Sequence, residues 1–167
     1  MRATVRLELR DSGGSVIETR QARNSVMQGG AELVANLFAG KATTAITHMG
    51  VGTSGEPAPD QFTSSALTTA GGTPDTSLQG DTDVPIAPGD FIIKTDPGNR
   101  LVRVQLHATL PPTAAVGTLR EAGLLSKKDA QSSLYNRVTF APIEKQGDHE
   151  LTMFWEVTFP YGDLNWM

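Results

Sequence analysis

The stretch from Glu150 to Phe159 alternates apolar and polar side chains with strand-like regularity, interrupted only by Phe154. Because successive residues of a β-strand point to opposite faces, the alternation predicts a strand with one buried side. A slip of one residue would move Trp155 into water and Glu156 into the core, so the pairing register is strongly specified. The side chains expected on the buried face are Leu151, Met153, Trp155, Val157 and Phe159.

Several other segments have strand character and supply this strand with neighbours. Residues 3–10 alternate in the same way, and the turn sequence 11–14 separates them from an extended stretch at 15–22, which together predict a hairpin. The turn sequence Asp96-Pro97-Gly98-Asn99 marks a second hairpin. The remaining predicted strands are 45–51, 91–95, 100–110, 117–125 and 133–140, with a polar loop at 126–133.

One helix is predicted at about residues 25–39, with Asn24 or Ser25 as N-cap and Gly40 just beyond its end. Gly29 and Gly30 inside it lower helix propensity, which indicates either a later start or close packing against a strand. The apolar residues that recur at steps of three and four, as on one helix face, are Met27, Ala31, Val34, Leu37 and Phe38.

The fold class follows from these elements. A chain of 167 residues fits one domain, and 17 glycines and 10 prolines are typical of an all-β protein with long loops. We therefore expect residues 1–167 to form a single mainly β domain, an antiparallel β-sandwich or flattened barrel with one α-helix lying on it.

Composition excludes several classes of function. The chain has no cysteine, so neither disulfides nor a Cys-ligated zinc site can form. A net charge of −4 without a basic stripe argues against nucleic acid as a partner. The charged, alternating N-terminus is unlike a signal peptide, and no apolar run reaches the length of a membrane span. We expect a protein made in the cytoplasm.

Two irregular segments are predicted to bind partners. Residues 52–90 are rich in Gly, Pro, Ser and Thr and have little periodicity; they form either a mobile surface loop or an arm that orders against a neighbouring subunit. Residues 160–167 form a tail too short for a core of its own, which either folds back on its sheet or docks into another chain. The candidate partner-binding residues are Tyr161, Leu164, Trp166 and Met167 in the tail and Pro57, Pro59 and Phe62 in the arm.

No catalytic, metal-binding or cofactor-binding residue is predicted. His48, His107 and His149 lack metal-ligand spacing. The string Gly52-Thr53-Ser54-Gly55 does not have the spacing of a nucleophile elbow. The carboxylates with the potential to act as a glycosidase acid and base are Glu121, Glu144 and Glu156, but a cross-strand pair of Glu121 with Arg120, Arg137 or Lys145 is the favoured interpretation.

Four strings of the sequence resemble a group of bacteriophage tail proteins related to the N-terminal, tail-collar domain of tail fibres. This group also occurs in phage-derived contractile injection systems. The helix pattern N-x-V-x-x-x-G-x-x-x-(I/V)-A-x-L is followed by I-T-H-M-x-V-G-T, by an E-A-G-L strand, and by (A/N)-R-V-x-F-x-P-I-x-K. In this chain the four elements are Asn24 to Leu37, Ile46 to Thr53, Glu121 to Leu124 and Asn136 to Lys145.

The resemblance implies a non-enzymatic structural subunit of a virion or tail-like particle, at the baseplate, collar or fibre root. Its partners would be other tail proteins and copies of itself. Tail fibres continue into a shaft and a receptor-binding tip, whereas this sequence ends at Met167, which favours an adaptor, wedge-like or decorating subunit. Two alternatives remain open: a capsid decoration (cement) protein, and a carbohydrate-binding sandwich that uses Trp155, Trp166 or Tyr161 to stack on a host-surface glycan.

Overall fold

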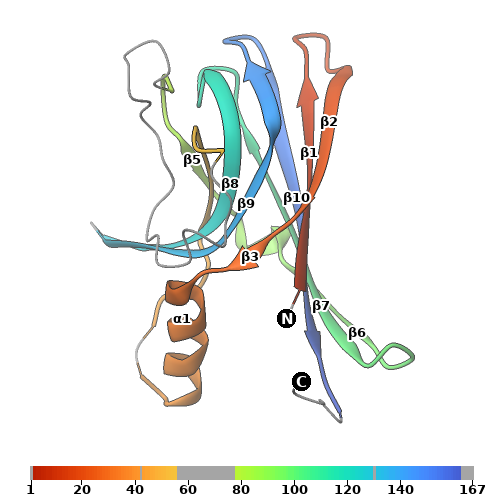
Figure 1. The fold of residues 1–167 in the computed structure, drawn as a ribbon, viewed down its shortest axis with the longest axis vertical. Helices are drawn as coiled ribbons and strands as arrows, with labels where there is room; N and C mark the ends of the chain where they lie inside the picture. The colour runs from red at the N-terminus through yellow and green to blue at the C-terminus, as the bar shows by residue number, and fades with distance from the viewer. Residues whose placement is uncertain (1, 42, 56–77, 130, 163–167) are drawn as a thin grey trace.

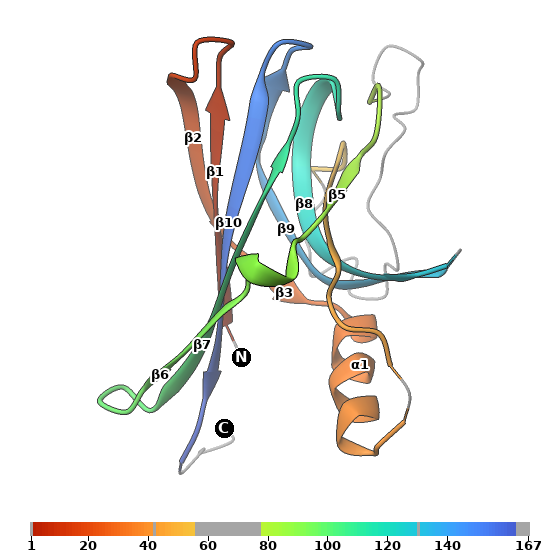
Figure 2. The same ribbon diagram turned by 180° about the vertical axis from the view of Figure 1, so that it is seen from behind.

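The computed structural model, which describes residues 2–41, 43–55, 78–129 and 131–162, is a sandwich of two antiparallel sheets with one α-helix. Figures 1 and 2 show the two sheets packed face to face and the helix projecting from one end of the second sheet. The predicted fold class, mainly β with a single helix, is confirmed.

The first sheet has the strand order β2-β1-β10-β7-β6, with β10 at its centre. β10 is the strand predicted from its alternation, and its register places Trp155 opposite Val5 on one side and Leu106 on the other. Both predicted hairpins, β1–β2 and β6–β7, are present. The strands of this sheet are β1 (Arg2–Arg10), β2 (Val16–Arg23), β6 (Ile92–Asp96), β7 (Leu101–Leu110) and β10 (Glu150–Pro160).

The second sheet has the order β3-β9-β8-β4-β5. Part of the pattern-free stretch 52–90 belongs to it, because residues 83–85 pair with β4 and are followed by the short 3₁₀ helix η3 (Pro88–Asp90). The strands of this sheet are β3 (Ser25–Val26), β4 (His48–Gly52), β5 (Asp83–Pro85), β8 (Gly117–Lys128) and β9 (Gln131–Lys145).

The core fills the space between the two sheets. Trp155 is its largest apolar side chain, and 2 % of its surface is exposed. Side chains from both inner faces surround it in one continuous apolar cluster, as expected for aligned sheet packing. Among the members of this cluster are Leu7, Met153 and Val157 of the first sheet and Met49, Leu124 and Val138 of the second.

The helix begins later than predicted. α1 spans Gln28–Phe38, and Met27 occupies the N-cap position without a side-chain cap. The reason is tertiary: Ser25 and Val26 pair with β9 as strand β3, and the Met27 amide donates to the carbonyl oxygen of Tyr135 at 3.0 Å. Close packing explains the glycines, since a Cβ on Gly30 would lie 2.1 Å from that same carbonyl oxygen.

The predicted polar loop 126–133 is wrong in extent, because β8 continues to Lys128 and β9 starts at Gln131. Two polar side chains of this hairpin bond to other segments. Ser126 Oγ donates to the Thr44 carbonyl at 2.8 Å, and Lys127 Nζ contacts the Asp83 carboxylate at 2.8 Å. The predicted strand 45–51 likewise begins only at His48. Polar side chains therefore led the sequence analysis to predict a loop where the chain forms strands. Those side chains are bonded to residues of other segments.

We expect Trp155→Ala to lower the free energy of unfolding by about 3 to 5 kcal/mol, the range for emptying a large aromatic site in a core. Chemical denaturation measures the change. The matched control is Phe154→Ala, which removes a ring from the outward face of the same strand and costs about 1 kcal/mol through lost ring contacts. Equal losses for the two variants would contradict the register of β10.

Candidate functional site

Several large apolar side chains are exposed on separate elements at one end of the sandwich, which we call the open end. They are Leu37 and Phe38 at the last turn of α1, Ile93 of β6, and Tyr161 beyond β10. Phe38 is 90 % exposed and Ile93 is 70 % exposed. Figures 1 and 2 show that α1, the β6–β7 hairpin and the end of β10 all project in this direction.

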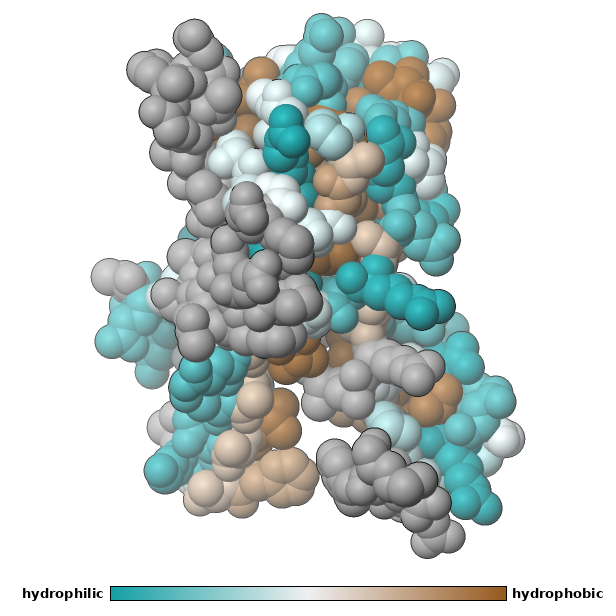
Figure 3. Space-filling view, in the orientation of Figure 1, coloured by the Kyte–Doolittle hydropathy of each residue, from teal (hydrophilic) through white to brown (hydrophobic). Residues whose placement is uncertain are grey.

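The C-terminal end of the helix is exposed, whereas Val34 packs against the main core and the first turn docks on the sandwich. Met27, Leu125 and Leu134 form a small second core there, and Gly30 is the buried residue of α1 itself. Figure 3 shows apolar surface running along one side of α1 to its free end, with hydrophilic surface on the other side. An amphipathic helix of this kind normally covers its apolar stripe with another element.

The β6–β7 hairpin is exposed because the first sheet extends past the second. Ile93 pairs with Val104, and Val104 pairs with the core residue Val157, so the three side chains share the inner face of the sheet. Val157 is buried, yet Ile93 is open to solvent. The inner face of the first sheet therefore becomes uncovered at Ile93, on the edge strand. In addition, β6 is an edge strand, whose free main-chain groups can pair with another strand.

Of the seven predicted partner-binding residues, Tyr161 lies in the described part of the chain. It is 41 % exposed, and its amide donates to the Arg100 carbonyl at 3.0 Å. The sequence prediction missed Leu37, Phe38 and Ile93. It placed Leu37 and Phe38 on the apolar face of the helix without predicting their exposure. The predicted residues that lie outside the described part of the chain are Leu164, Trp166, Met167, Pro57, Pro59 and Phe62.

The outer face of the first sheet carries a second candidate surface centred on Phe154. The Arg6 guanidinium lies 4.5 Å from the ring centroid, and the His107 ring stacks on Phe154 with centroids 5.9 Å apart. A shallow groove of about 510 Å³ runs beside this row. Cation–π and ring stacking occupy the ring, so it does not offer a free platform for a sugar. Trp155 is also excluded as a platform, because it is buried in the core.

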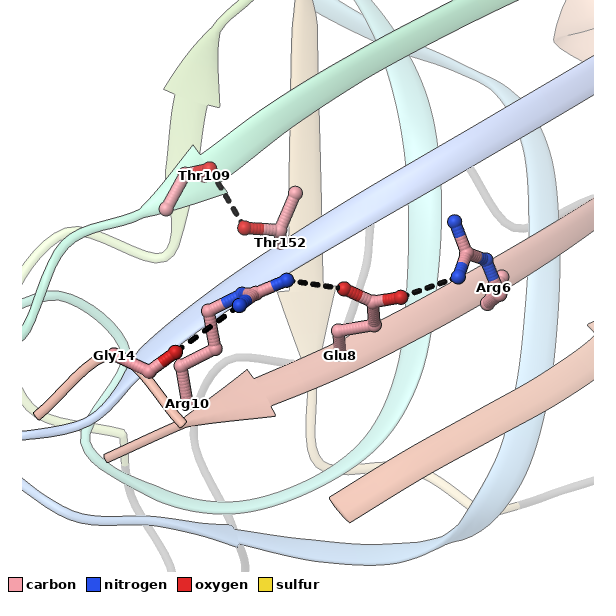
Figure 4. Close-up of polar contacts among 6 residues, drawn as sticks. All are labelled: Arg6, Glu8, Arg10, Gly14, Thr109 and Thr152. Atoms are coloured by element: carbon pink, nitrogen blue, oxygen red, sulfur yellow. Dashed lines mark hydrogen bonds and ion pairs between the residues drawn. The ribbon is translucent and has the colours of Figure 1, made fainter. Parts of the chain in front are cut away.

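A polar network stiffens the same outer face. Figure 4 shows Glu8 between Arg6 and Arg10, with Arg10 Nη2 at 2.7 Å from one carboxylate oxygen and Arg6 at the other. Arg10 also donates to the Gly14 carbonyl at 3.1 Å, which ties the β1–β2 turn to its strand. Glu8, Arg6 and Arg10 on this face are therefore paired with one another, in contrast to the exposed apolar groups of the open end.

The three candidate acid–base carboxylates do not converge. Glu121 contacts Arg137, with Nε to Oε2 at 2.5 Å, and both side chains are buried. Glu144 accepts from Thr118 Oγ1 at 2.8 Å, and Glu156 accepts from Gln105 Nε2 at 2.8 Å on the other sheet. The predicted pairing of Glu121 with Arg137 is correct, but the pair is buried rather than at the surface.

Glycines are register neighbours of this buried pair. Gly50 lies between two core-facing residues and so faces outward, where its cross-strand partner is Gly123, whose other partner is Arg137. Gly52 is likewise the partner of Glu121. The pair fixes the register of β8 and β9 at the centre of the second sheet.

The described residues contain no cluster of three or more His, Asp or Glu side chains able to hold a metal ion. His48, His107 and His149 lie on three separate segments, with Thr47, Asp90 and Asp148 as their respective neighbours. A polar groove of about 720 Å³ separates α1 from the β8–β9 hairpin, lined by small hydroxyl side chains and by Glu32 and Lys128.

Comparison with protein-family models, with curated proteins and with solved structures found no match to this chain. Within the described residues, no helix has the length and apolarity that crossing a membrane requires.

We expect Glu121→Gln to lower the free energy of unfolding by about 3 kcal/mol, because it removes the charge that the buried Arg137 guanidinium contacts. Glu121→Leu combined with Arg137→Met should recover most of this loss. Thermal or chemical denaturation measures both. Glu144→Gln, at an exposed carboxylate, is the control and changes stability by less than about 0.5 kcal/mol. A loss for Glu121→Gln as small as that of the control would disprove the structural role of the pair.

Proposed function

We propose that this chain is a non-enzymatic structural subunit of a phage tail or of a phage-like contractile particle, attached at the baseplate, collar or fibre root. The open end is its docking surface for neighbouring subunits. On this proposal the subunit is located in the virion, and it is made in the cytoplasm of the host.

The observation that carries the proposal is the exposure of α1. A helix of 11 residues is marginally stable in water unless packing supports its apolar stripe. Here the first turn and Val34 contact the sandwich, and the C-terminal end of the helix exposes Leu37 and Phe38, the latter by 90 %. Monomeric proteins seldom leave large apolar groups gathered at one end, and such surfaces mark sites of protein association.

The positions of the resemblance strings also support the proposal. The helix string ends in α1, and the other three strings fall on β4, β8 and β9. β4, β8 and β9 are adjacent in the second sheet, and α1 packs on β9. The segments that resemble tail proteins are therefore one contiguous structural unit, built around the buried Glu121 and Arg137 pair and the close approach of Gly30 to β9.

We expect Phe38→Glu to prevent incorporation of the subunit into the particle without unfolding it, because a charge at the centre of an apolar interface is left desolvated. Incorporation is measured by purifying particles from cells that carry the variant gene and probing them for the tagged subunit. Circular dichroism of the purified variant checks that the fold is retained.

Two control variants distinguish loss of the interface from a general effect of added negative charge. Phe38→Leu keeps an apolar side chain and should be incorporated normally. Gln131→Glu adds the same charge at the tip of the β8–β9 hairpin and should also be incorporated. Normal incorporation of Phe38→Glu would overturn the proposed role of the open end. Imaging the tagged subunit on the particle separates a tail position from the capsid-decoration alternative.

A further inference from the structure

Among the described residues, the charged side chains at the two ends of the sandwich differ in sign. The open end, toward which α1 and the β6–β7 hairpin project, is rich in basic side chains. The opposite end, which we call the turn end, consists of the β1–β2, β7–β8 and β9–β10 turns and is rich in acidic side chains. Figures 1 and 2 show these ends at opposite extremes of the long axis.

The basic groups of the open end are available to a partner. Lys41 follows α1, Lys94 lies on β6, and Arg100 lies in the β6–β7 turn, all three exposed. None of them has a carboxylate within ion-pair distance in the described part of the chain. Arg103, in contrast, is neutralised by Asp96 at 2.7 Å. In the part of the chain that the structure describes, the open end therefore combines exposed basic side chains with the apolar groups Leu37, Phe38 and Ile93.

The turn end offers the complementary chemistry. Its acidic residues are Asp11, Glu144, Asp148 and Glu150. Its cations are already engaged, because Arg10 binds Glu8 and the buried Lys145 donates to the carbonyls of Pro111 and Pro112 at 2.9 Å each. Next to the β1–β2 turn, Val16 and Ile17 are 45 % and 49 % exposed, so this end also carries an apolar patch.

We propose that the open end of one copy docks on the turn end of a second copy, so that the chains associate head to tail along their long axis. This inference rests on the proposed function, in which the open end is a docking surface. Basic side chains then meet acidic ones, and the two exposed apolar patches cover each other. A contact between unlike ends is heterologous, so it propagates into a ring or a column instead of closing as a dimer.

The charge distribution disfavours the simplest alternative, a two-fold dimer through two open ends. Such a dimer would place Lys94 and Arg100 of one copy against the same groups of the other, and like charges in apposition are repulsive. Head-to-tail contact removes that repulsion. Its strength should fall as salt rises, since exposed charges are screened over about 8 Å at physiological ionic strength.

A charge-swap experiment on the purified full chain tests the inference. The open-end variant carries Lys94→Glu and Arg100→Glu, and the turn-end variant carries Asp148→Lys and Glu150→Lys. Sedimentation velocity measures self-association at low and high salt. We expect the wild type to associate most strongly at low salt, and each variant alone to associate on the order of ten-fold or more weakly.

Mixing the variants gives the decisive result. The acidic open end of the first variant matches the basic turn end of the second, and their unaltered ends match as in the wild type. The equimolar mixture, and a single chain that carries all four substitutions, should therefore recover association. The matched control, Arg120→Glu with Lys128→Glu on the side of β8, shifts net charge equally and should associate as the wild type does.

Three results would overturn the inference: a wild type that is monomeric at every salt concentration, a turn-end variant that associates normally, or a mixture that does not recover. A monomeric wild type would leave the proposed function standing, because a particle subunit can dock on unlike neighbours. Loss of Phe38→Glu from the particle tests that function separately.

Discussion

The fold depends on the register of β10. This strand pairs with β1 on one side and β7 on the other, and in that register alone Trp155 and its apolar neighbours enter the core. The same register turns Phe154 outward, where Arg6 and His107 hold it. Because a shift of one residue would exchange these two faces, the central strand orients the whole first sheet and with it the β6–β7 hairpin that extends beyond the second sheet.

Buried polar groups give the second sheet the same specificity. The Glu121–Arg137 pair joins β8 to β9 at 2.5 Å, and Lys145 holds the Pro111 and Pro112 carbonyls of the β7–β8 connection. A buried pair of this kind contributes little net stability, but breaking it is costly, so it acts against alternative registers. Exposed apolar groups of the chain include those where α1 and the first sheet project beyond the sandwich.

The sequence predicted what local periodicity determines and missed what depends on distant contacts. The alternation of β10, β7 and β1 identified the first sheet and both hairpins. The start of α1 was missed because Ser25 and Val26 pair with a strand more than a hundred residues away. The exposure of Phe38 was missed because a helical apolar stripe reveals an apolar face, not whether this chain supplies the surface that covers it. Glu121 was recognised as a pairing residue, but its burial was not, because burial depends on contacts that local periodicity does not reveal.

The central claim is that α1 and the open end are surfaces built to be covered by another chain. Amide hydrogen exchange of residues 28–38, measured in the isolated protein and in the assembled particle, tests it most directly. The amides of the last turns of α1 should exchange rapidly in the isolated chain and become strongly protected after assembly, while the amides of β10 stay protected in both states. Equal exchange of α1 in the two states would contradict the claim.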